Sequence, residues 1–236
     1  MLQIRLLTFH ATIISMNSRS LRRLHIVVLA AGFSTRLGRP KALARVHGAG
    51  LLARALKAAQ TLDAAALIAV IPPNAAQYRL MARGMKVRWA ANPQRAQGLS
   101  SSVRRGILAA RYAPAILLIP ADLVNLKHRD LARLVRRWQS APRRLIARRV
   151  GRGAAIPVIL PRWLFARALE VVGDIGLREL IEQLRPDQRV LVELPSAEQD
   201  VDTPQALDEV RRGFRPRGTN VGSRERRAPP RRSYPS

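Results

Sequence analysis

The segment from Leu29 to Leu43 combines the residue types that phosphate chemistry requires. It reads Leu-Ala-Ala-Gly-Phe-Ser-Thr-Arg-Leu-Gly-Arg-Pro-Lys-Ala-Leu, so small residues are followed by hydroxyl side chains, arginines and a lysine. Small residues let a backbone approach a ligand closely, and successive N–H groups of such a turn bind phosphate oxygens. The cations Arg36 and Lys41 can neutralise the charge of a polyphosphate. The segment therefore predicts a phosphate-binding loop.

Two better-known phosphate loops do not match this segment. A Walker A loop has four residues between its glycines and a lysine directly after the second, whereas five residues separate Gly32 from Gly38 here and Lys41 comes later. The dinucleotide fingerprint G-x-G-x-x-G is also absent. An ordinary glycine-rich turn between a strand and a helix is the alternative interpretation.

Short aliphatic runs alternate with amphipathic segments from His25 onward, which predicts an α/β domain with a mostly parallel central sheet and helices on both faces. We expect strands at residues 25–29, 66–71, 86–90, 115–119, 145–149, 158–160 and 190–194. We expect helices at residues 51–62, 74–83, 101–111, 128–140, 162–171, 175–184 and 204–212. The loop follows the first strand, at the sheet edge where such domains bind ligands.

The length of 236 residues suits one domain of this kind, for which we expect residues 24–212. Residues 1–23 are expected to be a disordered arm or the product of an upstream start codon. Residues 213–236 are rich in Arg, Pro, Gly and Ser, which predicts a basic disordered tail. No apolar run approaches the roughly 20 residues that span a bilayer, so no membrane association is expected. The sequence has no cysteine, which excludes disulfides and thiolate chemistry and is compatible with the cytoplasm.

The formal net charge is +27, from 42 Lys and Arg against 15 Asp and Glu, and favours a polyanionic partner. Nucleic acid is one such partner, but only 4% of residues are aromatic, so stacking platforms for single strands would be scarce. A phosphorylated small molecule is the better candidate. Because almost all the cations are arginines, a GC-rich coding bias is an equally good explanation of the charge.

The segment from Leu29 to Lys41 resembles the signature L-A-[AG]-G-x-S-x-R-x-G-x-P-K of the nucleotidyltransferases that include the molybdenum cofactor cytidylyltransferases and guanylyltransferases, and every defined position is filled. The resemblance implies a Rossmann-like, GT-A-like three-layer nucleotidyltransferase fold and transfer of a nucleoside monophosphate from an NTP to a phosphorylated acceptor. It implies catalytic roles for Lys41, Arg36 and Asp122. The implied nucleotide-binding residues are Leu29, Ala30, Ala31, Gly32, Ser34, Arg36, Lys41, Asn92, Gly98, Ser101 and Ser102.

A serine-rich helix start extends the resemblance. Asn92-Pro93, followed by Gly98 and the serines Ser101 and Ser102, is similar to the family's N-P-x-x-x-x-G-[ML]-x-x-S segment. Free N–H groups and hydroxyls at a helix start suit a nucleotide or a phosphorylated acceptor. A plain N-cap without a ligand is the alternative.

Two carboxylates are implied as ligands of a Mg²⁺ cofactor. Asp122 follows a buried strand, and the segment Asp200-Val201-Asp202-Thr203-Pro204 resembles the family's D-[IV]-D-T-P. Mg²⁺ takes hard oxygen ligands, usually one or two carboxylates with phosphates and water. We therefore expect Asp122 and Asp202 as the metal ligands, with Asp200 in reserve; helix capping is the alternative for these acids.

The acceptor side departs from the family. Members carry Asp-Gln-Pro or Asp-Met-Pro where this chain has Asp122-Leu123-Val124, and Gly-His-Pro or Gly-Asn-Pro where it has Ala155-Ile156-Pro157. The segment Gly173–Leu180 is similar to G-D-x-G-x-R-x-L-[LI] and is expected near the acceptor.

The resemblance leaves several functions open. The Ala30-Ala31-Gly32 form of the loop resembles the CTP-using branch, so we expect CTP as substrate, a molybdopterin-type cofactor as acceptor and a monomeric protein. Three alternatives remain: a GTP-using guanylyltransferase, a non-catalytic carrier that delivers cofactor to an apo-molybdoenzyme, and a nucleic-acid-binding protein.

Overall fold

The computed structural model describes residues 23–32, 40–173 and 176–197. Its strands are Leu24–Leu29 (β1), Arg45–Val46 (β2), Ala49–Gly50 (β3), Ala66–Ile71 (β4), Arg88–Ala91 (β5), Ala115–Pro120 (β6), Leu145–Val150 (β7), Gly153–Pro161 (β8) and Arg189–Val192 (β9). Its α-helices are Leu51–Gln60 (α2), Ala76–Met81 (α3), Leu99–Ala109 (α4), His128–Ser140 (α5), Phe165–Glu170 (α6) and Gly176–Glu182 (α7). Short 3₁₀ turns are Lys41–Leu43 (η2), Arg95–Gln97 (η3), Arg162–Leu164 (η4) and Pro195–Ala197 (η5).

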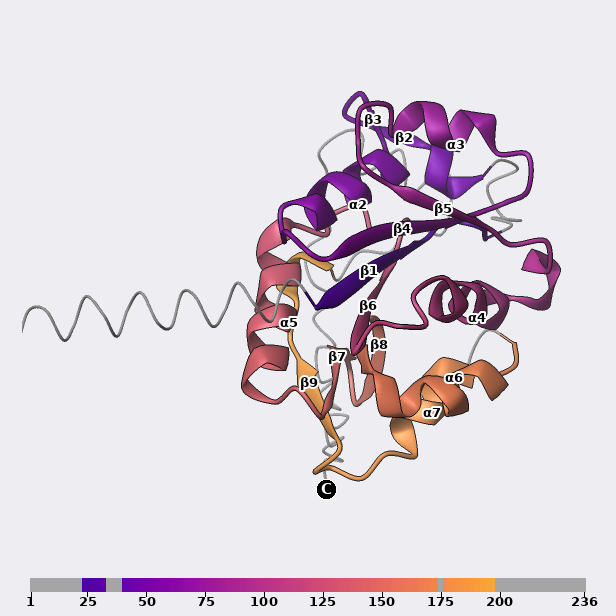
Figure 1. Cartoon of the computed structure of the whole chain (residues 1–236). Helices are drawn as coiled ribbons and strands as arrows, with labels where there is room; N and C mark the ends of the chain where they lie inside the picture. Colours follow the sequence, from indigo (N-terminus) through magenta and orange to yellow (C-terminus); the bar gives the residue numbers. More distant parts are fainter. Residues whose placement is uncertain (1–22, 33–39, 174–175, 198–236) are drawn as a thin grey trace, which may run out of the picture.

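Seven strands form the central sheet, in the order β5-β4-β1-β6-β8-β7-β9 (Figure 1). The pairs β4–β5, β1–β4, β1–β6 and β7–β9 are parallel, and β8 runs antiparallel to both of its neighbours. The expectation of a mostly parallel α/β sheet is therefore confirmed. The carboxyl ends of β1, β4, β5 and β6 consequently meet at one edge of the sheet, which we call the carboxyl edge.

Two layers of helices cover the sheet, as expected. Helices α2 and α5 pack on one face, where their buried leucines meet alternate strand residues such as Ile26 and Leu117. Helices α4, α6 and α7 pack on the other face, against residues such as Val27 and Leu118 (Figure 1). Because successive strand residues point to opposite faces, each aliphatic strand contributes side chains to both hydrophobic cores.

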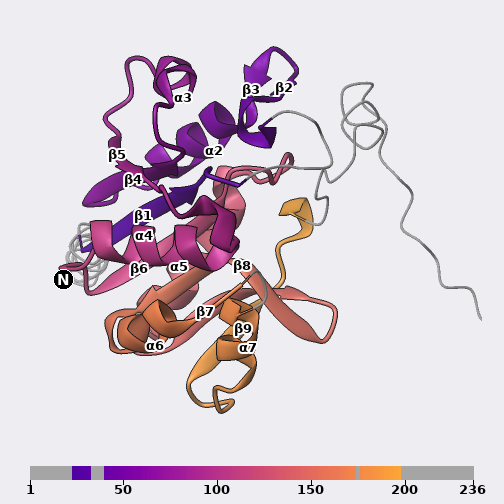
Figure 2. The ribbon, with the colours of Figure 1, turned by 90° about the vertical axis from the view of Figure 1, so that its right-hand side faces the viewer.

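The boundaries of several elements differ from the sequence expectation. Strand β8 begins at Gly153 instead of at residue 158, because only Gly151 and Arg152 separate it from β7 and so short a connection forms an antiparallel hairpin. The hairpin β2–β3, which lies beside α2 (Figure 2), was not expected at all. Its turn is His47-Gly48, both with positive φ, which is a less recognisable turn signal than Asn-Gly.

Helix positions were predicted better than helix ends. Helix α5 has the expected bounds, whereas α2 and α3 are shorter than expected and α4 begins two residues earlier, at Leu99. The helix expected at residues 204–212 lies outside the described residues, as do most of the arm 1–23 and all of the tail 213–236. Within the described ranges, no helix combines the length and the apolar character needed to cross a membrane.

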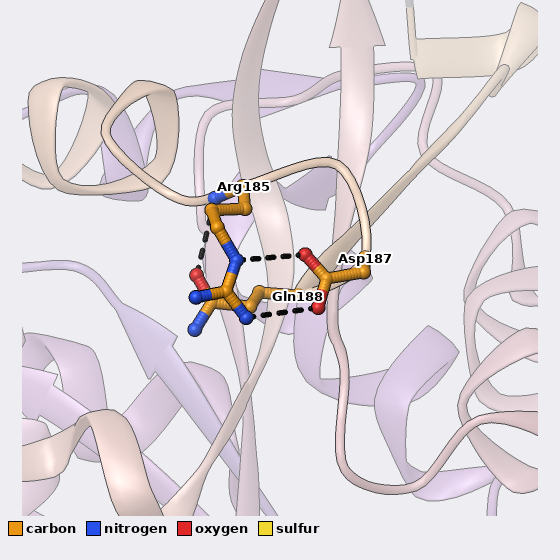
Figure 3. A network of polar contacts seen from close by, with 3 residues as sticks. All are labelled: Arg185, Asp187 and Gln188. Carbon is orange, nitrogen blue, oxygen red and sulfur yellow. Dashed lines mark hydrogen bonds and ion pairs between the residues drawn. The ribbon is translucent and has the colours of Figure 1, made fainter.

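The turn between α7 and β9 is closed by a bidentate ion pair (Figure 3). Arg185 donates from Nε and Nη2 to the two carboxylate oxygens of Asp187, each at 3.0 Å, and its backbone N–H donates to Gln188 Oε1 at 3.1 Å. The hydrogen bond from Arg185, more than its charge, lowers the pKa of Asp187. This turn leads into β9 from the end of the sheet opposite the carboxyl edge.

Replacing Gly106 with alanine is expected to lower the free energy of unfolding by about 2 kcal/mol, as overpacked cores do. A Cβ at this position of α4 would lie 2.6 Å from Val27 Cγ1, and the Val27 side chain is fully buried in β1. Urea denaturation measures the effect. The control is Arg105→Ala on the exposed side of α4, for which a change within about 0.5 kcal/mol is expected; equal stability of the two variants would contradict the close approach of α4 to β1.

Candidate active site

The end of β1 is fixed between two other strands at the carboxyl edge. The backbone N–H of Ala30 donates to Val70 O at 2.8 Å, and that of Ala121 donates to Leu29 O at 3.0 Å. Gly32, the last described residue before the gap, is exposed and has open space on its Cβ side. The loop therefore leaves the sheet directly above β1, which is where the sequence placed a phosphate-binding turn.

The two alanines of this turn have a structural reason to be small. Ala30 packs into the core beneath α2 and α5, while Ala31 packs into the core beneath α4. Their methyl groups are buried, so larger side chains would displace core residues. We had expected the small residues to serve ligand approach alone, and the packing adds this second reason. Ser34 and Arg36, also expected in this loop, lie outside the described residues.

Lys41 and Asp122 lie together at the carboxyl edge. Lys41 Nζ is 3.9 Å from Asp122 Oδ2, with the lysine side chain 15% exposed and the carboxylate 40% exposed. Lys41 opens the 3₁₀ turn η2 that follows the glycine loop, and Asp122 is the second residue after the end of β6. The fold thus brings together two of the three expected catalytic residues, which are far apart in the sequence.

The loop after Asp122 is held rigidly beneath it. Leu123 and Val124 are buried, and the Arg54 side chain of α2 donates from Nη2 to Val124 O at 3.2 Å. At the end of the loop, the backbone N–H of Lys127 donates to Asp130 Oδ2 at 3.0 Å, which begins α5. No sequence pattern predicts this role for Arg54, because its contact is with a backbone carbonyl.

Three of the expected nucleotide-binding side chains bond to one another. Asn92 Nδ2 donates to Ser101 Oγ at 2.9 Å and to Ser102 Oγ at 3.1 Å, and Asn92 Oδ1 accepts from the Gln94 N–H at 3.0 Å. All three side chains are buried, with 4% exposure or less. They therefore join the end of β5 to the start of α4, and direct contact between them and a nucleotide stays a prediction.

Gly98 connects these two elements with a backbone that glycine alone adopts readily. Its φ of 82° and ψ of −169° lie outside the regions open to other residues. The Ser101 hydroxyl donates to Gly98 O at 2.8 Å, so the first turn of α4 is closed on this glycine. The helix start consequently reaches the carboxyl edge in one defined conformation.

Asn92→Ala is expected to lower the free energy of unfolding by about 2 kcal/mol, because buried groups that lose their partners cost about 1–3 kcal/mol. The substitution removes the acceptor of the Gln94 N–H and the donor to both serines. Thermal denaturation measures the change. Ser140→Ala is the control, since it removes an exposed side-chain hydrogen bond at the end of α5; a comparable loss in this variant would contradict a special role for the Asn92 network.

The oxygen ligands at the carboxyl edge suit a magnesium ion that is also bound by substrate. Asp122 presents a half-exposed carboxylate beside Lys41. Mg²⁺ is commonly held by one or two carboxylates together with phosphates and water. The second expected ligand, Asp202, lies outside the described residues. Within the described ranges, no group of three or more His, Asp or Glu side chains forms a protein-only metal site.

The described histidines lie on three separate elements. His25 is at the beginning of β1, at the opposite end of the strand, where burial and then the charge of Arg88 lower its pKa. His47 lies in the β2–β3 turn and His128 begins α5 as an exposed residue. The arrangement instead provides a cation and a carboxylate, which suits reactions of phosphates that need no proton abstraction.

A glycine-containing turn, a lysine and a carboxylate thus meet at the carboxyl edge of this α/β sheet, the edge at which such folds bind ligands. The model of the MobA-like NTP transferase domain matches residues 26–189, and the chain belongs to this family. It is accordingly a nucleotidyltransferase that takes a nucleoside triphosphate as substrate. The expected three-layer nucleotidyltransferase fold is confirmed. A search of curated protein sequences gave no match.

Solved structures of similar fold include three nucleotidyltransferase-like proteins. Rv0371c from Mycobacterium tuberculosis H37Rv is 25% identical, with a TM-score of 0.64 over 80% of this chain and 98% of that chain. A nucleotidyl transferase from Methanothermobacter is 22% identical, with a TM-score of 0.67 over 81% of this chain and 97% of that one. Molybdopterin-guanine dinucleotide biosynthesis protein A from Archaeoglobus fulgidus is 14% identical, with a TM-score of 0.61 over 80% and 97% of the two chains.

Proposed function

We propose that this chain transfers CMP from CTP to the terminal phosphate of an acceptor in the cytoplasm, with Mg²⁺ as cofactor. The observation that carries the proposal is the approach of Lys41 to Asp122, at 3.9 Å, beside the end of the glycine loop. The Ala30-Ala31-Gly32 form of the loop resembles that of CTP-using members and supports CTP over GTP. The resemblance to molybdenum cofactor cytidylyltransferases makes a molybdopterin-type cofactor the first acceptor to assay.

In the proposed reaction, an oxygen of the acceptor phosphate forms a bond to the α-phosphorus of CTP. The bond from that phosphorus to the oxygen bridging to the β-phosphate breaks, and pyrophosphate leaves with the electron pair. A phosphate monoester is already an anion near neutral pH, with a second pKa of about 6, so no general base is needed. This agrees with the described histidines lying on three separate elements.

Lys41 has the position to bind the triphosphate and to stabilise charge that develops on the leaving pyrophosphate. Asp122 has the position to hold Mg²⁺, with Asp202 as the second expected ligand. The bound cation would neutralise phosphate charge and orient the phosphate oxygens. Rv0371c from M. tuberculosis has been solved as a complex with manganese, another divalent cation. The buried Asn92, Ser101 and Ser102 would fix the start of α4 at this edge.

The test is pyrophosphate release from each of the four NTPs with Mg²⁺ and a panel of phosphorylated acceptors that includes a molybdopterin-type cofactor. We expect release from CTP to exceed release from GTP. A preference for GTP would identify a guanylyltransferase. Tight nucleotide binding without release from any NTP would identify a non-catalytic carrier that serves an apo-molybdoenzyme.

A further inference from the structure

An apolar pocket of about 210 Å³ opens between β8, α7 and the start of α4. Figure 1 shows α4, α6 and α7 together on the same side of the sheet. Among the described residues, its lining consists of aliphatic side chains and one arginine, Arg178. The aliphatic residues include Leu99, Val150, Ala154, Ile156, Leu177 and Ile181.

The pocket lies at the same edge of the sheet as Asp122. Strands β6 and β8 are antiparallel, and Leu118 pairs with Val158. This pairing ends at Leu118 and Val158, and β8 then bulges at residues 156–157 against β7. Because β8 is antiparallel to β6, its first residues, Gly153 to Ala155, lie toward the end of the sheet at which β6 ends. Ala154 and Ala155 of the pocket lining therefore lie on β8, the strand next to β6, after which Asp122 follows.

The pocket also adjoins the helix start expected to bind the nucleotide. Leu99 of its lining directly follows Gly98 and is the first residue of α4. The backbone N–H of Ser100 donates to Gly173 O at 3.1 Å, which ties this helix start to the turn before α7. A molecule in the pocket would consequently have one end near the Asp122 carboxylate and the α4 start.

The two segments that depart from the family pattern have different surroundings in this structure. Leu123 and Val124 are buried, so they fill the core. Ala155 and Ile156 line the pocket, where family members carry Gly-His or Gly-Asn. The change therefore replaces a hydrogen-bonding side chain with an aliphatic one at the position of Ile156.

The one cation of the described lining already has a partner. Arg178 Nε donates to Glu182 Oε1 at 2.8 Å, within α7. A polar ring placed in this pocket would find only the remaining N–H donors of Arg178 among the described lining side chains. Each further hydrogen-bonding group left buried without a partner would cost about 1–3 kcal/mol. An apolar group would gain about 0.8 kcal/mol for each buried methylene.

We propose that this pocket holds the organic part of the acceptor and that this part is apolar, so that the acceptor is a phosphomonoester of a hydrocarbon group. The inference rests on the proposed transfer to a phosphate, which would face Asp122 while the hydrocarbon enters the pocket. A molybdopterin-type acceptor, whose ring is rich in hydrogen-bonding groups, is then the poorer ligand.

The test is the binding of n-alkyl phosphates, from ethyl to hexyl phosphate, to the full chain with Mg²⁺ and a non-transferable CTP analogue. Isothermal titration calorimetry measures Kd, with ribose 5-phosphate as the polar reference. We expect Kd to fall about fourfold for each added methylene, which corresponds to about 0.8 kcal/mol, until the pocket is filled. A Kd independent of chain length, or tighter binding of ribose 5-phosphate, would overturn the inference.

Two variants place the effect in the pocket. Ile156→Asn is expected to weaken hexyl phosphate about tenfold and to leave ethyl phosphate unchanged, because only the longer chain reaches the apolar wall. Val150→Thr keeps the side-chain shape and tests the rim, where Val150 is 46% exposed. Val172→Thr is the matched control outside the lining and is expected to bind like the parent. Equal effects of Val150→Thr and Val172→Thr, with none from Ile156→Asn, would overturn the assignment.

Turnover separates this inference from the proposed function. Pyrophosphate release with a molybdopterin-type acceptor, together with alkyl phosphates that bind without chain-length dependence, overturns the apolar pocket and leaves the transfer reaction standing. Chain-length dependence that Ile156→Asn reduces, without pyrophosphate release from any NTP, supports the apolar pocket and overturns the transfer reaction.

Discussion

Asp122→Asn is expected to reduce kcat by about 100-fold or more while the fold stays intact, because the carboxylate is the proposed ligand of the metal that neutralises transition-state charge. Asparagine preserves the size and the hydrogen-bonding capacity of the side chain and removes its charge. The ion pair with Lys41 spans 3.9 Å and its carboxylate is 40% exposed. Pairs of this kind contribute about 0–1 kcal/mol to stability, so the free energy of unfolding is expected to change little.

The measurement is pyrophosphate release at saturating CTP, over a series of Mg²⁺ concentrations, with thermal denaturation in parallel. If Asp122 holds the cation, the variant also needs more Mg²⁺ for half-maximal activity. Asp187→Asn is the matched control, since it neutralises an exposed carboxylate that pairs with Arg185 at the opposite end of the sheet. Full activity of Asp122→Asn at the Mg²⁺ concentration that saturates the parent would remove Asp122 from the site.

The central strands could be predicted from the sequence because burial on both faces requires nearly continuous aliphatic runs. Residues 66–71 and 115–119 are such runs, and they form β4 and β6. Helix α5 was predicted with its correct ends, because Leu131, Leu134 and Trp138 repeat at helical spacing. The start of strand β8 was misplaced because its first three residues, Gly153 to Ala155, have low strand propensity. The first strong strand former in β8 is Ile156.

The chemistry of the site stays a prediction from residue types, whereas its geometry required the fold. The residues from Leu29 to Lys41 indicated a phosphate-binding loop because small and cationic residues occur together there. The pairing of Lys41 with Asp122 depends on the order of β1 and β6 in the sheet, which the sequence does not state directly. Arg54 could not be predicted, because its partner is a carbonyl in a distant loop.

The packing of polar residues also changed the interpretation of one motif. Asn92, Ser101 and Ser102 were expected to contact the nucleotide, because free hydroxyls at a helix start suit phosphates. In the structure the three side chains satisfy each other within the protein. A hydroxyl's type and spacing predict that it will find a partner, but only the three-dimensional packing determines which partner it finds.

Lys41→Ala is expected to reduce kcat/KM by about 100- to 1,000-fold, which is the usual cost of removing one group that stabilises developing charge. The lysine side chain is 15% exposed and its Nζ lies 3.9 Å from Asp122 Oδ2, beside the proposed metal ligand. Lys41→Arg keeps the charge but replaces a compact ammonium with a planar guanidinium, and is expected to restore only part of the activity. Steady-state kinetics with CTP measures both effects.

Lys57→Ala is the control for the loss of one lysine, because Lys57 is exposed on α2 and Lys41 is held at the carboxyl edge. Activity within about twofold of the parent is expected for this variant, since surface substitutions away from a site have small effects. The double variant Lys41→Ala with Asp122→Asn is expected to lose less activity than the product of the two single losses, because the two groups act on the same phosphates. Fully multiplicative losses would show that the two side chains act at separate places, and the proposed active site would then lose its central contact.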